Sequence, residues 1–423
     1  MHALIAILIF MVVYFFIISE KINRVIPAIL GAVLLLFFGV FKNPADVFTK
    51  YIDFNTIFLL IGMMAFVFTI QETGFFEYVA FKILKISKGS LKKTFLLLNF
   101  AVFTFSAFLD NVTTILIFVP ITLAIADAVE IEPSFMIIAE IISSNIGGTT
   151  TLIGDPPNIM IGSAAKLSFL NFVMNTGVAG IIIFTVSIFV IYLLNFKSLN
   201  VKFESSTFQN AERFNEKKVR KSFLLVILTI LLFSIQEFIK VENSIIALGM
   251  GFLAILIVGD KEPGDYLGKI EWETIFFFIG LFIVTGALED TGVLEKFAEY
   301  LEKAFGGSER MFGLSLFSTS FVMSGFVDNI PFTATMIPII KSLPRVNPEI
   351  FVNLKPIWWA LSLGACLGGN LTPIGASANV VALAILEKSQ RKKMGFWRFL
   401  KNTLLINILV FVIALIFLDI RYF

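Results

Sequence analysis

The sequence predicts an all-α polytopic membrane protein with two inverted-topology repeats of five crossings each, and each repeat holds a re-entrant hairpin and a broken helix. Three observations carry this prediction. Of 423 residues, 57% are hydrophobic and only 15% are charged. Apolar runs of about 17 to 23 residues recur along the chain, which is the length that spans a ~30 Å hydrocarbon layer. Motifs of the first half return in the second half, and both halves contain glycine- and proline-rich interruptions.

The two halves repeat each other at a nearly constant spacing. SAFLDNVTTILIFVP at 106–120 returns as SGFVDNIPFTATMIP at 324–338, an offset of 218. SSNIGGTTTLIGDPPN at 143–158 returns as GACLGGNLTPIGASAN at 364–379, an offset of 221. We therefore predict a first repeat over 1–196 and a second over 222–423. The polar segment 197–221 is the predicted linker.

The elements of the first repeat follow from its apolar runs. The first run, 3–19, lacks a positive n-region and a small-residue cleavage site, so we expect a retained span and not a signal peptide. Region 94–128 is predicted to be a re-entrant hairpin, because two full helices would place positions 110–111 in the headgroups. The remaining expected elements are crossings at 25–41 and 54–70, a broken segment at 134–166 and a last crossing at 172–196.

The second repeat is predicted by the same patterns. Its expected elements lie at 222–239, 243–259, 273–289, 310–343, 356–389 and 398–418, with an amphipathic surface segment at 295–303. Each half crosses the membrane an odd number of times, so the halves are expected to be inverted relative to each other. The loops at 20–24, 82–93, 197–221, 259–273 and 387–401 hold 22 of the 33 Lys and Arg residues. This bias predicts a cell (inner) membrane protein with these loops and the linker in the cytoplasm.

The interruptions indicate where a central site lies. Glycines and prolines free backbone carbonyls from the helical ladder, and within a membrane such groups are tolerated only where they line an enclosed cavity. Threonine and asparagine side chains add neutral ligands for a cation. Inverted repeats with interrupted helices are typical of secondary transporters, which expose one site alternately to each side.

The paired aspartates, Asp110 and Asp328, are the most informative residues. A carboxylate at the bilayer centre costs roughly 2.5 to 3.5 kcal/mol, so it persists only when it is paired, protonated or bound to an ion. A proton and a cation would compete for such a carboxylate, which is a simple mechanism of exchange. The alternative interpretation is a plain helix N-cap at a membrane surface.

Other residues either have two possible roles or exclude classes of protein function. Asp155 is either a turn residue before Pro156 or a site residue, because Ala376 replaces it in the second half. Cys366 is expected to be a packed residue and not a metalloid ligand. With one histidine, His2, and one cysteine, the chain cannot build a His-based catalytic dyad, so we expect no enzyme. A net charge of +2 does not suggest nucleic acid as a partner.

At these two motif pairs the sequence resembles the ion transporter superfamily, in the branch of arsenite permeases and NhaD sodium/proton antiporters with a citrate-transporter-like domain. Its motifs also resemble those of the melanosomal P protein group and its bacterial relatives. The resemblance implies elevator-like movement in a homodimer. In the superfamily's dicarboxylate transporters a Ser-Asn-Thr motif at each hairpin tip binds sodium and substrate. Here the matching positions are 110–112 and 328–330, and aspartate replaces serine in both.

These observations predict an antiporter that moves a small inorganic ion against protons or sodium, with no cofactor besides the coupling ion. Arsenite or oxyanion efflux, with a possible ATPase subunit, and an ion channel on a transporter fold are the alternatives. Dicarboxylate uptake is disfavoured, because two fixed carboxylates repel a di-anion. Sodium is expected at Asp110, Asn111, Asp328 and Asn329. The expected binding residues are Asp110, Asn111, Thr113, Thr114, Asn145, Gly147, Gly148, Thr151, Gly154, Asp155, Asn158, Asp328, Asn329, Thr333, Gly369, Asn370, Thr372, Pro373, Gly375 and Asn379.

Overall fold

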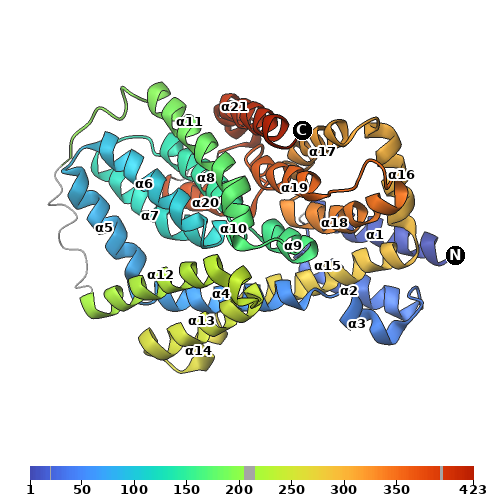
Figure 1. Ribbon diagram of the computed structural model, residues 1–423. Helices are drawn as coiled ribbons and strands as arrows, with labels where there is room; N and C mark the ends of the chain where they lie inside the picture. The colour runs from blue at the N-terminus through green and yellow to red at the C-terminus, as the bar shows by residue number, and fades with distance from the viewer. Residues whose placement is uncertain (20, 204–214, 391–393) are drawn as a thin grey trace.

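The computed structural model describes residues 1–19, 21–203, 215–390 and 394–423. Within these ranges the chain is all helical and forms two layers, which lie one above the other in Figure 1. We call them the lower and the upper layer. The lower layer consists of α1 (His2–Ser19), α2 (Val25–Phe37), α4 (Phe54–Gln71), α12 (Glu216–Ile239), α13 (Asn243–Val258) and α15 (Trp272–Asp290), with the short helices η1 (Pro44–Asp46), α3 (Val47–Lys50) and α14 (Pro263–Leu267).

The upper layer holds both predicted hairpins and both broken helices. Its first-half helices are α6 (Leu91–Ser106), α7 (Asn111–Ala128), α8 (Ser134–Thr149), α9 (Pro156–Ala165), α10 (Phe169–Phe172) and α11 (Val178–Leu194), with a π-helical turn, η2 (Val173–Gly177), before α11. Its second-half helices are α17 (Glu309–Ser324), α18 (Asn329–Val346), α19 (Lys355–Gly368), α20 (Ser377–Gln390) and α21 (Phe396–Tyr422). Two helices connect the layers, α5 (Phe75–Ser87) and α16 (Val293–Phe305).

The expected helices are present with small shifts of their ends. Within the described residues, seven helices are long and apolar enough to cross a membrane. The predicted crossing at 25–41 is shorter, because α2 ends at Phe37 and Gly39 follows with φ 60°, a conformation that favours glycine. Two boundaries differ from those expected: α12 begins at Glu216 and not at 222, and α5 extends into the predicted loop at 82–93. Linker positions 204–214 and loop positions 20 and 391–393 lie outside the described residues.

The two halves of the chain are interlocked in space. In the lower layer α4 of the first half packs on α13 of the second, and α2 packs on α15. In the upper layer α7 packs on α20, and α9 packs on α18. The repeats are thus not separate globular units. Their boundaries and their inversion across a membrane remain predictions.

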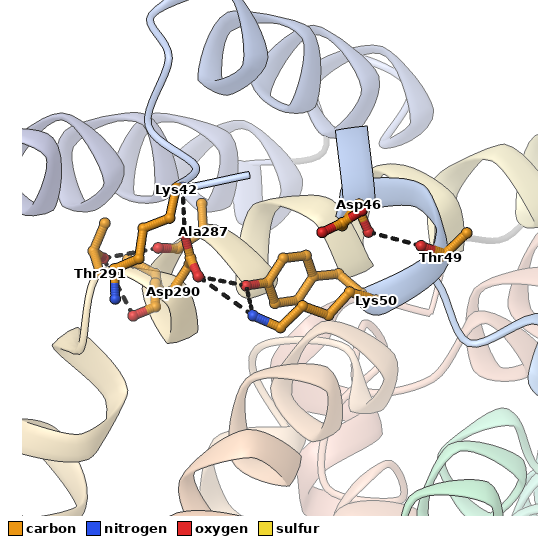
Figure 2. Close-up of polar contacts among 9 residues, drawn as sticks. Lys42, Asp46, Thr49, Lys50, Ala287, Asp290 and Thr291 are labelled. Carbon is orange, nitrogen blue, oxygen red and sulfur yellow. Dashed lines mark hydrogen bonds and ion pairs between the residues drawn. The ribbon is translucent and has the colours of Figure 1, made fainter. Parts of the chain in front are cut away.

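Equivalent carboxylates anchor the ends of two lower-layer helices. At the end of α15, Asp290 accepts hydrogen bonds from the Tyr51 hydroxyl (2.7 Å) and the Lys42 amide (2.8 Å), and Lys50 lies 3.4 Å away (Figure 2). Glu72, 218 positions earlier, follows α4 and pairs with Lys261 and Lys269. Hydrogen bonds from these two lysines lower the pKa of Glu72. Each half thus fastens a helix end of the other half.

Candidate functional site

Each hairpin tip rests on the break of a neighbouring helix. The first tip joins α6 to α7, and the hydroxyl of Thr151, in the break between α8 and α9, donates to the Ala107 carbonyl at this tip. The second tip joins α17 to α18, and Thr372, in the break between α19 and α20, donates in the same way to Gly325. The repeated Asp-Asn and Gly-Gly motifs thus lie together because each tip contacts a break.

Glycine allows this close contact. A Cβ atom on Gly147 would lie 2.3 Å from the Phe103 carbonyl oxygen, and one on Gly368 would lie 2.3 Å from the Phe321 carbonyl oxygen. Real Cβ atoms do not approach so closely. The Gly-Gly motif therefore serves to pack α8 against α6 and α19 against α17 without a gap.

An asparagine closes each break. The Asn158 amide donates to the carbonyls of Gly148 (3.3 Å), Thr149 (3.1 Å) and Thr151 (2.9 Å). The amide of Asn379, its counterpart at offset 221, donates to the carbonyls of Gly369 (2.7 Å) and Thr372 (2.9 Å). Because a buried carbonyl without a partner is costly, these side chains hold the interrupted backbone in shape.

Buried amides join the two breaks at the centre of the upper layer. The Asn145 amide of α8 donates to the side-chain oxygens of Asn370 (2.9 Å) and Asn379 (3.0 Å) in the second half. Asn111, at the first tip, lies 3.4 Å from Asn145. Asn370 is fully buried, and its amide nitrogen has no hydrogen-bond partner among the described residues. Buried polar side chains from both halves of the chain therefore form one hydrogen-bonded network.

A cavity of about 80 Å³ lies between this network and the lower layer. Asp110, Asp155 and Asn329 line it from the upper layer, and Arg24 and Glu271 line it from the lower layer. The Asn329 amide donates to both carboxylate oxygens of Asp155 at 3.1 Å. Asp155 is 2% exposed. The lining thus holds three carboxylates and one guanidinium, an excess of negative charge that favours a cation.

The two motif aspartates have different surroundings. Asp110 is the N-cap of α7, with one oxygen 2.8 Å from the Thr113 amide and the other 2.5 Å from the Thr113 hydroxyl. Asp328 makes no side-chain cap bond to α18. The residue equivalent to Thr113 is Pro331, which has no N–H to donate. The Asp328 carboxylate instead accepts from Arg24 at 2.6 Å, beside a second cavity of about 360 Å³.

The structure brings most of the predicted site residues to the contact between tips and breaks, but it does not bring them all to one cavity. Asp110, Asn111, Asp155 and Asn329 line the smaller cavity, whereas Asp328 lines the larger one. The carboxylates of Asp110, Asp155 and Glu271 line one cavity without converging as a set of metal ligands, and no three His, Cys, Asp or Glu side chains among the described residues do so. The other predicted residues do not line the smaller cavity: Thr113, Thr114, Asn145, Gly147, Gly148, Thr151, Gly154, Asn158, Thr333, Gly369, Asn370, Thr372, Pro373, Gly375 and Asn379.

Comparison with known proteins gives the family of the chain. The model of a family described as "Citrate transporter" matches residues 14–364. This chain belongs to the citrate transporter family. The expected membership of the ion transporter superfamily is thereby confirmed, and so is the expectation that the protein is a transporter and not an enzyme.

Relatives of this citrate transporter family member match it over most of its length. The "46 kDa membrane protein" of Mycobacterium leprae is 36% identical and covers 99% of both chains. An "Uncharacterized transporter" of Mycobacterium tuberculosis is also 36% identical, over 100% of this chain and 99% of its own. The P protein of Homo sapiens is 32% identical over 89% of this chain and 55% of its own length.

A solved structure shares the fold. The crystal structure of the YdaH transporter of Alcanivorax borkumensis, described as having an unusual topology, matches with a TM-score of 0.66. The match covers 92% of this chain and 88% of YdaH, at 12% sequence identity. At this identity the likeness concerns the fold alone.

Sequence reasoning missed the lower-layer residues that line the cavities of this transporter. Arg24 and Glu271 precede the apolar helices α2 and α15. Arg24 entered the prediction only as a positive loop charge, and Glu271 did not enter it. One signal was present for Arg24: a positive side chain at a helix N-terminus opposes the helix dipole, so it is seldom placed there for the sake of the helix. Ser106 was also missed, although its hydroxyl donates to the Asn111 side-chain oxygen at 2.6 Å.

Proposed function

We propose that this membrane transporter is a secondary active antiporter that exchanges a small inorganic cation, sodium or lithium, for protons. The observation that carries the proposal is the small cavity lined by Asp110, Asp155 and Glu271. Carboxylate, amide and carbonyl oxygens are the ligands that hard cations prefer. Protonation of the same carboxylates would replace the cation, so one site serves both ions in turn.

The cavity size also supports an inorganic ion. Pockets for organic ligands usually measure about 300–1,000 Å³, and the cavity beside Asp110 and Asp155 measures about 80 Å³. A citrate anion would in addition face an excess of carboxylates. The family description nevertheless makes citrate the second candidate, and the larger cavity beside Arg24 has room for an organic anion.

Transport is proposed to occur by elevator-type movement of the upper layer relative to the lower one. The upper layer contains both tips and both breaks, so these parts of the site would move together, while Arg24 and Glu271 would stay with the lower layer. The helices α5 and α16 connect the two layers and would act as the hinged arms. The setting of the proposal is the cell membrane, with segment 197–221 in the cytoplasm and the protein in a homodimer. An ATPase subunit belongs only to the arsenite-export alternative.

The test uses proteoliposomes with a pH-sensitive dye inside, challenged in turn with sodium, lithium, potassium, arsenite, citrate and chloride. We compare wild type with Asp110→Asn, Asp155→Asn and Asp328→Asn, which keep the side-chain shape and remove the charge. Asp46→Asn, at an exposed position of η1, is the matched control. We expect sodium or lithium to drive a saturable proton flux, which each site variant lowers by at least about tenfold, equivalent to about 1.4 kcal/mol.

Each alternative has its own result in this experiment. Flux driven by arsenite alone would support oxyanion export, and flux driven by citrate alone would support carboxylate transport. Flux that does not saturate and shows no counter-transport would support a channel. Unchanged sodium-driven flux in all three site variants would contradict the proposed roles of the aspartates.

A further inference from the structure

We propose that Arg24 is a tethered cation that pairs with Asp328 while no ion is bound and so holds the unloaded upper layer to the lower one. This inference rests on the proposed function and concerns the coupling at the same site. Arg24 precedes α2 in the lower layer, and Asp328 precedes α18 in the upper layer. The ion pair therefore joins the two parts that must move relative to each other.

The guanidinium is held in place from below. It lies over the ring of Phe277 in α15, with 4.9 Å from its central carbon to the ring centroid. The neighbouring Asn23 donates to Glu273 of α15 at 2.8 Å, and its side-chain oxygen accepts from the Val25 amide at 3.1 Å. The segment before α2 is thus fixed to α15, and Arg24 is presented to the upper layer on a firm support.

Arg24 lies between the two cavities. Its side chain lines both the cavity of about 360 Å³ and the cavity of about 80 Å³. Asp328 lines the larger cavity, and Asp110 and Asp155 line the smaller one. An ion that enters through the larger cavity meets the Arg24–Asp328 pair before it reaches the other two aspartates.

The second hairpin is suited to this exchange of partners. Asp110 accepts a hydrogen bond from a backbone amide of its own helix, α7. Asp328 makes no equivalent cap bond, because Pro331 has no N–H to donate. The carboxylate of Asp328 is therefore free for a partner outside α18. The side chains of Arg24 and Asp328 are 30% and 19% exposed, so the pair is only partly shielded from water and an ion can compete for it.

A second contact of the lower layer holds the same hairpin. The Tyr14 hydroxyl of α1 donates to the Pro331 carbonyl at 2.8 Å and lies 2.6 Å from the Thr335 hydroxyl. The first turns of α18 are thus fastened to α1 and to the start of α2. When a cation replaces Arg24 at Asp328, the ion pair between the two layers is lost. Only the neutral hydrogen bonds of Tyr14 then join this hairpin to the lower layer, so the loaded upper layer moves more readily.

The Arg24–Asp328 ion pair would couple the movement of the cation to the movement of protons. An exchanger fails if its empty form returns across the membrane, because the cation then moves without protons in the other direction. The Arg24–Asp328 pair is strongest when the site is empty, and it therefore opposes that return. Removing Arg24 is expected to raise the apparent cation affinity and to allow uncoupled cation movement.

The first test measures binding without transport. We record the thermal unfolding midpoint of the detergent-purified protein against sodium chloride, with choline chloride holding the ionic strength constant. The variants are Arg24→Gln and Arg24→Lys. The matched control is Arg310→Gln, because Arg310 pairs with Asp419 at 2.7 and 2.9 Å within the upper layer. We expect the half-maximal sodium concentration to fall about tenfold in Arg24→Gln, less in Arg24→Lys, and not in Arg310→Gln.

A further variant tests the same inference from the hairpin side. Pro331→Thr restores the residue type of Thr113 and gives Asp328 an N–H to accept from. It should weaken the pair with Arg24 and lower the half-maximal sodium concentration in the same direction as Arg24→Gln. It also keeps the inference testable if the Arg24 variants do not fold.

The second test measures coupling in proteoliposomes that carry an inward sodium gradient. We follow sodium uptake and the opposing proton flux together. Wild type and Arg310→Gln should keep a fixed ratio of the two, whereas Arg24→Gln should take up sodium with a lower proton flux per sodium ion. Arg24→Lys, which keeps the charge, should recover most of the coupling.

The outcomes separate this inference from the proposed function. If Asp328→Asn abolishes the sodium response but Arg24→Gln behaves like Arg310→Gln in both tests, Arg24 is not a tethered cation and the antiporter proposal stands. If wild type shows no sodium response, both proposals are overturned. If only Asp328→Asn responds like wild type, the Arg24 inference is overturned, and the antiporter proposal, which rests on the cavity lined by Asp110, Asp155 and Glu271, stands. A lowered sodium requirement together with reduced coupling in Arg24→Gln would establish the role.

Discussion

Gly147 and Gly368 show, at the scale of single residues, why this fold depends on small side chains. They are 221 positions apart and have the same structural role: each allows a broken helix to contact the backbone of a hairpin arm. Membrane helices lack a hydrophobic driving force between them, so close backbone contact is a major source of their association. The contact also sets the distance between the tip and the break, on which the site geometry depends.

We therefore predict that Gly147→Ala destabilises the protein. The added Cβ would lie 2.3 Å from a backbone oxygen that cannot swing away, and overpacking of this kind costs about 1–3 kcal/mol. The measurement is the thermal unfolding midpoint followed by circular dichroism in detergent. Gly249→Ala in α13 is the control, because no atom of the described part of the chain outside its own helix backbone lies within 4 Å of its added Cβ. An equal midpoint for both variants would contradict the packing role of Gly147.

The importance of single residues could be predicted from the sequence only in part. The paired aspartates were identifiable because an Asp-Asn pair within an apolar region is costly and appears twice. The different surroundings of Asp110 and Asp328 were also present in the sequence, as Thr113 against Pro331, but the motif match concealed them. The partner of Asp328 could not be found, because Arg24 lies 304 positions away in the chain and nothing local indicates the contact.

At the scale of elements, the breaks in α8–α9 and α19–α20 are the parts that define the site. Each break leaves carbonyls without helical partners, and each is closed by an asparagine from the following helix. The breaks face each other through Asn145, so a change in one should be felt in the other. The network is fully inside the protein, where an unsatisfied polar group is most costly.

We predict that Asn158→Ala and Asn379→Ala destabilise the protein by similar amounts, about 1–3 kcal/mol each, because each leaves buried carbonyls unpaired. Both should also reduce transport. Asn195→Ala is the control, since Asn195 also donates to a carbonyl, that of Ile191 at 2.9 Å, but at the half-buried end of α11. The unfolding midpoints of the three variants are compared. A loss in one asparagine variant without the other would mean that the two breaks are not equivalent.

Long apolar elements were predictable because length and hydrophobicity alone decide them. The ends of the hairpins and breaks agree within a few residues with those expected from the repeated motifs. The helix α5 was missed, since Glu77, Lys82 and Lys85 make it look like a loop, although its counterpart α16 was recognised as amphipathic. Its apolar face is buried against other helices, and such tertiary packing is not visible in a window of sequence.

At the scale of the whole molecule, the contacts between the halves are reciprocal, and the inversion of the repeats across a membrane remains a prediction. Lower-layer helices pair across the halves, α4 with α13 and α2 with α15. The carboxylates that fasten their ends, Glu72 and Asp290, are 218 positions apart and each binds lysines of the other half. A two-fold relation between halves would produce such reciprocal pairs. The side of the membrane on which each end lies is a separate question.

The inversion can be tested with single cysteines placed at pairs of positions 218 residues apart. The pairs are Lys42 with Asp260 and Ile22 with Lys240, all exposed. Each is replaced by cysteine in a Cys366→Ala background, which removes the buried native thiol. A membrane-impermeant maleimide is added to intact cells and to inverted vesicles. Unchanged wild type reports any labelling of Cys366 itself.

We expect the maleimide to label positions 42 and 240 from outside and positions 22 and 260 only from the cytoplasmic side. The physical reason is the distribution of lysine and arginine, because the loops at 20–24 and 259–273 belong to the positively charged set. If both members of a pair react from the same side, the repeats are not inverted. The elevator proposal would then lack the inverted-repeat symmetry that relates its two end states. If every position reacts from the opposite side, the inversion holds and the orientation is reversed. In that case Arg24, in the loop at 20–24, would approach Asp328 from the outer and not from the cytoplasmic side.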